Sequence, residues 1–111
     1  MELQASPQLE YEPKATDVLG KWIERLVHQE SSGRADIKIL DVNDRYSYGC
    51  LQFQEATFVS YSKRYFGTSN LSKLYDCQYQ KQLARRMLEE DINNWRHWYN
   101  STRKIGLPPL R

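Results

Sequence analysis

The chain has 111 residues, 13% of them aromatic and 27% charged, and its 16 basic and 14 acidic side chains leave a net charge of +2. This length suits one compact domain. The balanced charge argues against a nucleic-acid binder, which needs a clustered basic excess. No apolar run reaches the roughly 18 residues of a membrane helix, and no export signal precedes the domain, so the sequence as it stands predicts a soluble, unexported chain.

The first 15 residues contain two prolines and no periodic apolar pattern, which predicts a flexible arm before one domain over residues 16–111. Apolar residues then recur with helical spacing from Val18 to Val27. They predict an amphipathic helix with Thr16 as its N-cap. A Ser-Ser-Gly run follows Glu30 and is a typical stop signal, so the helix should end there.

The rest of the chain alternates one strand-like region with further helices. Apolar alternation between Ile37 and Tyr48, around the turn-forming VNDR, predicts a short β-hairpin. Helical periodicity follows over Glu55 to Phe66, then after Asp76 as an N-cap, and in a last short helix that carries Trp95 and Trp98. In the helix after Asp76 we expect a water-facing side formed by Lys81, Arg85 and Arg86. Together these elements predict an α+β fold, mainly helical, with one small β-hairpin beside a cleft.

The cysteines and histidines are sparse. Cys50 and Cys77 lie 27 residues apart without the CxxC spacing of zinc or dithiol sites, and two buried free thiols are favoured over a disulfide. His28 and His97 are too far apart in sequence to indicate a metal site. We therefore predict no metal and no cofactor.

Glu30 is the residue whose position suggests chemistry. Cleavage of a glycosidic bond near neutral pH needs a carboxyl group that keeps its proton, so its pKa must rise from about 4.3 toward roughly 6. The negative end of a helix and nearby aromatic rings both disfavour the ionised form. The alternative is an ordinary solvated acid, because glutamates are abundant at helix ends.

Three short blocks resemble, in the same order, the lysozyme-like domain of soluble lytic transglycosylases and goose-type lysozymes. Glu30-Ser31 is similar to the family's Glu-Ser, Gly49-Cys50-Leu51-Gln52 to its Gly-Leu-Met-Gln, and Trp98-Tyr99-Asn100 to its Ala-Tyr-Asn. The resemblance spans Trp22 to about Lys104. It departs from the family at Cys50 and at Ser101, where members often continue toward a glycine.

The resemblance implies a lysozyme-like domain that cleaves the β-1,4 bond between N-acetylmuramic acid and N-acetylglucosamine in peptidoglycan, with Glu30 as general acid and base. The candidate substrate contacts are Ser31, Ser47, Tyr48, Gly49, Gln52, Tyr99 and Asn100. Each also has a purely structural explanation. Gly49, for example, suits a turn with positive φ or a close backbone approach.

A second carboxylate would decide the mechanism, and the hairpin region offers Asp36, Asp41 and Asp44. The transglycosylases that the chain resembles use one glutamate. It protonates the bridging oxygen and then accepts a proton from the 6-hydroxyl of the substrate, which leaves an anhydro sugar. Hydrolysis needs a water positioned by Asp41 or Asp44 instead. We favour the anhydro product and keep both routes open.

The expected partner is a peptidoglycan strand, bound by a monomer. The sequence leaves the compartment open, and action on peptidoglycan would imply the cell envelope or the outside of the cell. The first alternative is a catalytically inactive lysozyme-like module that binds glycan or serves in an assembly. A Glu30 paired with Arg34 or Arg45 would favour that alternative, whereas an open groove with Gln52 and Tyr99 facing Glu30 would favour the enzyme. The second alternative is a small nucleic-acid binder, for which SKRYF, KQLARRM and STRKIG supply basic residues.

Overall fold

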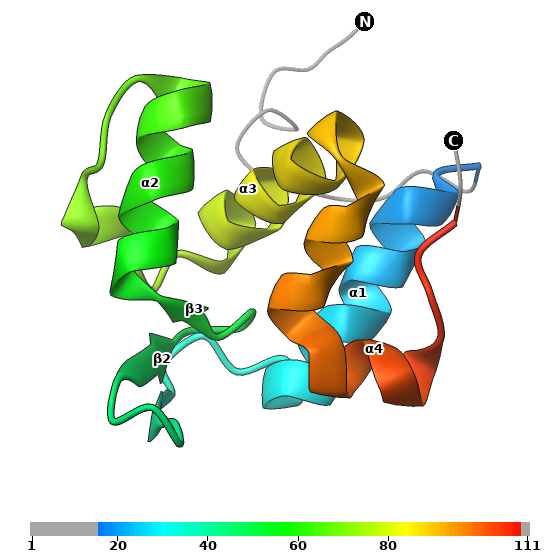
Figure 1. Cartoon of the computed structure of the whole chain (residues 1–111), viewed down its shortest axis with the longest axis horizontal. Helices are drawn as coiled ribbons and strands as arrows, with labels where there is room; N and C mark the ends of the chain where they lie inside the picture. Colours follow the sequence, from blue (N-terminus) through cyan, green and yellow to red (C-terminus); the bar gives the residue numbers. More distant parts are fainter. Residues whose placement is uncertain (1–15, 110–111) are drawn as a thin grey trace, which may run out of the picture.

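The structure is a computed structural model that describes residues 16–109, so the arm expected over residues 1–15 lies outside the described residues. The fold is α+β, as the sequence predicts: helices form most of the body, with a small sheet at one end (Figure 1). The elements are α1 (Val18–Ser31), β1 (Lys38–Leu40), β2 (Tyr46–Tyr48), β3 (Phe53–Gln54), α2 (Glu55–Phe66), η2 (Leu71–Lys73), α3 (Cys77–Glu90), η3 (Ile92–Trp98) and α4 (Tyr99–Ile105). Within the described residues, no helix combines the length and apolar character needed to cross a membrane.

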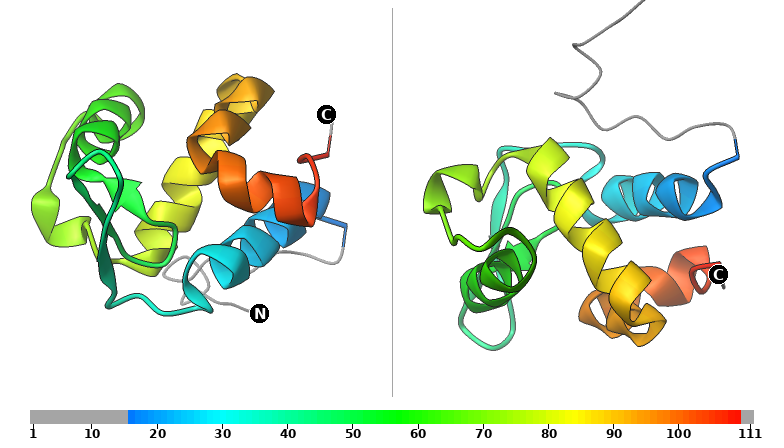
Figure 2. Two further views of the ribbon diagram at one scale, coloured as in Figure 1. Left: turned by 60° about the horizontal axis from the view of Figure 1, so that its bottom comes forward. Right: turned by 90° about the horizontal axis from the view of Figure 1, so that it is seen from above.

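The helices and the sheet form two lobes joined by α3. Figure 2 shows α1 beside α4 on one side of α3, and α2 with the sheet on the other. One apolar core runs through the junction, where Ile23 and Leu26 of α1 and Leu83 and Met87 of α3 are fully buried with Phe58 of α2. The helical periodicity therefore predicts the core correctly on both lobes.

The sheet contains the predicted hairpin and one strand more. Its order is β1-β2-β3, antiparallel throughout, and Ser47 of β2 pairs with Ile39 on one side and Gln54 on the other. The third strand has only two residues and continues directly into α2. Two residues are too few to show the alternation that identifies a strand, which is why the sequence does not indicate it.

A hydrogen bond at the start of α1 and two ion pairs between α1 and α3 correct two local predictions. Asp17, not Thr16, caps α1, because its carboxylate accepts from the backbone N–H of Gly20 at 2.9 Å. The same carboxylate pairs with Arg85, and Lys81 pairs with Glu24 at 3.0 Å. Two of the three basic residues expected to face water thus tie α3 to α1.

The expectation of free thiols is wrong, because Cys50 and Cys77 form a disulfide with a Cα–Cα distance of 5.6 Å. The bond joins the loop after β2 to the first residue of α3. Their separation of 27 residues gives no hint of this proximity, which only the folding of the sheet lobe onto α3 produces. A disulfide that closes a loop of this size typically contributes about 2–4 kcal/mol.

The C-terminal region is more complex than the single short helix expected. A 3-10 helix, η3, is followed directly by α4, which begins at Tyr99. Trp98, at the junction, is buried and donates its indole N–H to the carbonyl of Leu51 at 2.8 Å. This bond anchors the start of α4 against the loop after β2.

Candidate active site

The loop after β2, residues 49–52, is held in place by the buried side chain of Gln80. Gln80 of α3 donates its amide to the carbonyl of Tyr48 at 2.9 Å and accepts from the N–H of Leu51 at 2.8 Å. Gly49 has φ +79°, and a Cβ there would lie 2.6 Å from the Gln80 amide nitrogen. Glycine is therefore required both for the turn and for the approach of Gln80, as the structural explanation of Gly49 predicts.

This loop presents Gln52 toward the space between the lobes. Gln52 also has positive φ, at 55°, and its amide donates to the carbonyl of Gly49 at 2.9 Å. The side chain is thus fixed in place while it lines the hollow in front of Glu30. The disulfide, Gln80 and Trp98 are three separate anchors that determine where this loop lies.

Glu30 lies near the end of α1, half-buried, and faces the other lobe. The hydroxyl of Ser101 donates to its Oε2 at 2.6 Å. Burial raises the pKa of Glu30 above its ordinary 4.5, the Ser101 hydrogen bond opposes that rise, and the charge of Asp41 adds to it. The net rise makes Glu30 a carboxyl group that keeps its proton to higher pH than a solvated one.

Of the three candidate second carboxylates, the fold brings Asp41 to Glu30. The Asp41 carboxylate accepts hydrogen bonds from the hydroxyl of Ser47 and, at 2.8 Å, from the amide of Gln54. Asp36 instead forms an ion pair with Arg34 at 3.6 Å, and Asp44 occupies the hairpin turn with φ +64°. Neither Asp36 nor Asp44 lines the hollow that Glu30 faces.

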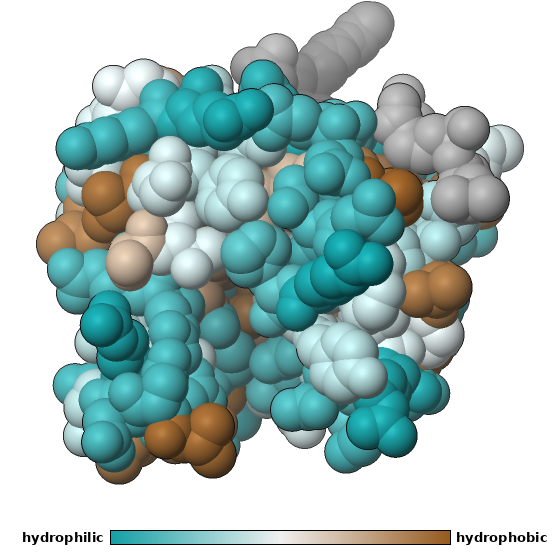
Figure 3. All heavy atoms as spheres, viewed as in Figure 1, coloured by the Kyte–Doolittle hydropathy of each residue, from teal (hydrophilic) through white to brown (hydrophobic). Residues whose placement is uncertain are grey.

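The hollow has a volume of about 310 Å³ and opens between the two lobes. Figure 3 shows the depression between the sheet and the C-terminal helices, with mostly hydrophilic residues around it. A second hollow of about 250 Å³ shares five lining residues with the first, namely Asp41, Ser47, Gln52, His97 and Trp98. The two form one continuous groove, which we call the cleft, and it extends from Glu30 to Gln54.

Four of the seven predicted substrate contacts line the cleft: Ser47, Gln52, Tyr99 and Asn100. Ser31 does not, because its hydroxyl donates to the carbonyl of Val27 and accepts from the N–H of Gly33, which closes the helix end. Tyr48 lies away from the cleft and packs edge-on against Tyr75, with ring centroids 5.7 Å apart.

The sequence does not identify three residues that matter here. Ser101 counts only as a departure from the family pattern, yet it is the hydrogen-bond partner of Glu30. His97 lines the cleft near the hydroxyl of Tyr61, 3.3 Å from its Nε2, and burial lowers its pKa. Gln80 does leave a signal, since it is a polar residue on the same helical face as Leu83.

Two further findings bear on the nature of the cleft. Within residues 16–109, Glu30 forms no ion pair, and Gln52 and Tyr99 both line its hollow. In the same part of the chain, no three His, Cys, Asp or Glu side chains cluster as metal ligands would.

No family model matches the chain, and neither a curated protein nor a solved structure is significantly similar to it.

Proposed function

We propose that this protein is a lysozyme-like enzyme that cleaves the β-1,4 bond between N-acetylmuramic acid and N-acetylglucosamine in peptidoglycan. The observation that carries the proposal is Glu30: a half-buried carboxyl group with a raised pKa, facing an open cleft and without a cationic partner in residues 16–109. An acid in that state keeps its proton to higher pH than a solvated glutamate, which suits it to general acid catalysis. A catalytically inactive glycan-binding module would not need a carboxyl group in this state.

In the first step, Glu30 protonates the bridging oxygen as the bond from that oxygen to C1 of the muramic acid breaks. Ser101 donates to Oε2, which leaves Oε1 to carry the proton. The carboxylate that results then serves as base. It accepts a proton from the substrate's own 6-hydroxyl, whose oxygen bonds to C1 and gives a 1,6-anhydro sugar.

Asp41 supports the alternative of hydrolysis as well. In that route a water replaces the 6-hydroxyl, its oxygen bonds to C1, and a carboxylate accepts its proton. Both hydrogen bonds that the Asp41 carboxylate accepts, from Ser47 and Gln54, end on Oδ2, so Oδ1 is left for such a water. We infer that the charge of Asp41 also raises the pKa of Glu30, and we favour the anhydro product because the transglycosylases that the chain resembles form it.

The rim of the cleft offers rings that suit sugar faces. Tyr99 is 52% exposed and stacks on Trp95, with ring centroids 6.0 Å apart. Arg96 lies over Trp95 at 5.5 Å from its centroid, on the same stretch of chain. The disulfide also supports the proposal, because such bonds persist in the oxidising compartments where peptidoglycan lies.

The test is digestion of purified peptidoglycan by the protein and by Glu30→Gln, with mass spectrometry of the released products. We expect anhydro-muropeptides from the wild type and none from the variant. Products with a reducing muramic acid, lost in Asp41→Asn, would make the enzyme a hydrolase. Retained binding to insoluble peptidoglycan without release by either protein would favour the inactive glycan-binding module.

A further inference from the structure

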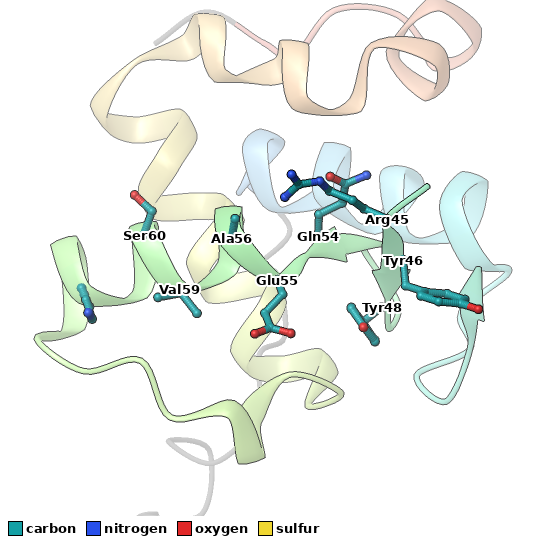
Figure 4. A pocket seen from close by; sticks show the side chains of 9 residues that line it. Arg45, Tyr46, Tyr48, Gln54, Glu55, Ala56, Val59 and Ser60 are labelled. Carbon is teal, nitrogen blue, oxygen red and sulfur yellow. The ribbon is translucent and has the colours of Figure 1, made fainter. Parts of the chain in front are cut away.

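A larger hollow, of about 670 Å³, lies beside the cleft between β2 and α2 (Figure 4). We call it the β2–α2 pocket. Its size falls within the range of roughly 300–1,000 Å³ that ligand sites occupy. Gln54 lines both the cleft and this pocket, and its amide donates to Asp41 in the cleft and, at 3.2 Å, to Asn43 of the hairpin. Gln54 is therefore the residue that the linings of the two spaces share.

Two tyrosines of β2 form one wall of the pocket. Tyr46 is 42% exposed, and Tyr48 is fixed by its edge-on contact with Tyr75. Lys38 of β1 lies 4.3 Å from the centroid of the Tyr46 ring. The rings are thus held in place by neighbours while one of them remains open to a ligand.

The opposite wall is one face of α2. Glu55, Val59 and Lys63 follow one another at intervals of four residues, which places them in a row along the helix. Arg45 enters from the hairpin, and Figure 4 shows it beside Gln54, with Glu55 and Tyr48 extending to the other side of the strand. The pocket thus combines tyrosine rings, an aliphatic patch and charges of both signs.

None of the charged side chains of Arg45, Glu55 and Lys63 has an ion pair or hydrogen bond within residues 16–109. Arg64, which follows Lys63 in α2, is by contrast paired with Glu90. Two unpaired cations and one unpaired anion around a single pocket match a ligand that carries carboxylates and an ammonium group.

We propose that the β2–α2 pocket binds the peptide branch of the peptidoglycan strand, a short peptide with carboxylates and a free amino group. Arg45 and Lys63 would bind its carboxylates, Glu55 its ammonium group, and the tyrosine rings its aliphatic segments. The inference rests on the proposed function, because a muramic acid held in the cleft carries such a peptide and Gln54 lines both spaces.

The experiment compares glycan strands that keep their peptides with strands from which an amidase has removed them. We expect Arg45→Ala/Lys63→Ala to raise KM roughly fivefold on the first substrate and to leave the second unchanged. The matched control is Lys21→Ala/Lys104→Ala, which removes the same charge from exposed sites outside both spaces. Glu55→Gln should weaken binding only where the peptide carries a free ammonium group.

A binding measurement makes the inference independent of catalysis. The probe is an N-acetylmuramyl tripeptide that ends in diaminopimelate, compared with N-acetylmuramic acid alone, and the readout is NMR shifts of the Tyr46 and Ala56 amides. The tripeptide should shift both signals in the wild type and, at the same concentration, much less in Arg45→Ala/Lys63→Ala.

The outcomes separate this inference from the proposed function. Equal KM values on both substrates, unchanged by the double substitution, would overturn the peptide site and leave the enzyme standing. Tripeptide shifts in the pocket without cleavage of either substrate would overturn the enzyme and support the peptide site. Absence of both cleavage and shifts would overturn both.

Discussion

Glu30 and Glu90 occupy nearly the same place in two helices of 14 residues, yet their surroundings have opposite effects. Glu30 is next to last in α1, and Glu90 is last in α3. Hydrogen bonds from Arg64, at 2.9 Å, and from Tyr65 lower the pKa of Glu90. Glu30 has the neutral hydroxyl of Ser101 as its partner, and burial raises its pKa.

The difference shows that a position at a helix end does not by itself create a proton donor. Both carboxylates lie at the negative end of a helix dipole, which disfavours ionisation of each. What separates them is the tertiary partner: a guanidinium for Glu90, and partial burial with a nearby carboxylate for Glu30. Substitutions of Glu30, Glu90, Asp41 and Ser101 therefore test this contrast.

The sharpest test replaces each glutamate by glutamine in turn. Glu30→Gln should reduce the rate of glycan cleavage by roughly 10²–10⁴-fold, because it removes the only proton donor assigned to the reaction. Glu90→Gln is the matched control and should leave the rate within about twofold, since Glu90 lies outside the cleft. Equal losses in the two variants, measured on soluble glycan strands, would contradict the proposed role of Glu30.

Removal of the neighbouring charge should move the pH dependence in a known direction. Asp41→Asn deletes a charge that raises the pKa of Glu30, so Glu30 should lose its proton at lower pH. The descending limb of kcat/KM against pH should shift to lower pH, with a several-fold loss of activity on the alkaline side. A loss approaching that of Glu30→Gln, without such a shift, would instead identify Asp41 as the base of a hydrolytic reaction.

Ser101→Ala should shift the descending limb of kcat/KM against pH in the direction opposite to Asp41→Asn. The Ser101 hydrogen bond lowers the pKa of Glu30, so its loss should raise that pKa and move the descending limb to higher pH. We expect only a several-fold change in rate, the usual weight of one hydrogen bond to a charged group. Parallel profiles for Ser101→Ala and Asp41→Asn would contradict the electrostatic account.

The smallest effect is on stability. Folding raises the pKa of Glu30 above its ordinary 4.5, so the ionised carboxylate destabilises the folded state, and this cost grows as pH rises from 4.5 through the raised pKa. Glu30→Gln should therefore raise Tm at pH 7 and have no such effect at acidic pH. Glu90→Gln should lower Tm slightly at pH 7, because the favourable ionised form of Glu90 is present above 4.5 and lost as pH falls through its lowered pKa. Thermal melts at both pH values measure the signs.

Local pattern was enough to predict most of the fold. The spacing of apolar residues predicts α2 with its observed bounds, Glu55–Phe66, and Asp76 is the N-cap of α3 as expected. Such features depend on residues within one turn or one strand, which the sequence displays directly. The two-residue β3 lacks that periodicity, and the sequence does not indicate it. The single last helix expected around Trp95 and Trp98 is instead the 3-10 helix η3 followed by α4.

The candidate site was predictable in part. Glu30, Gln52, Tyr99 and Asn100 come from motifs, and all four line the cleft. Motifs could not show where side chains point. Ser31 stands beside Glu30 in sequence, yet its hydroxyl bonds to the backbone of its own helix end.

Local sequence pattern predicts the long helices, the end of α1, and therefore the place of Glu30 along the chain. The packing of the two lobes brings Asp41, and not Asp36 or Asp44, to Glu30, lets Ser101 bond to it across 71 residues, and joins two cysteines in a disulfide. These features differ in the sequence range of the interactions that produce them. Helix formation depends on neighbours a few residues apart, whereas the burial and charge that raise a pKa come from segments that meet only when the two lobes pack together.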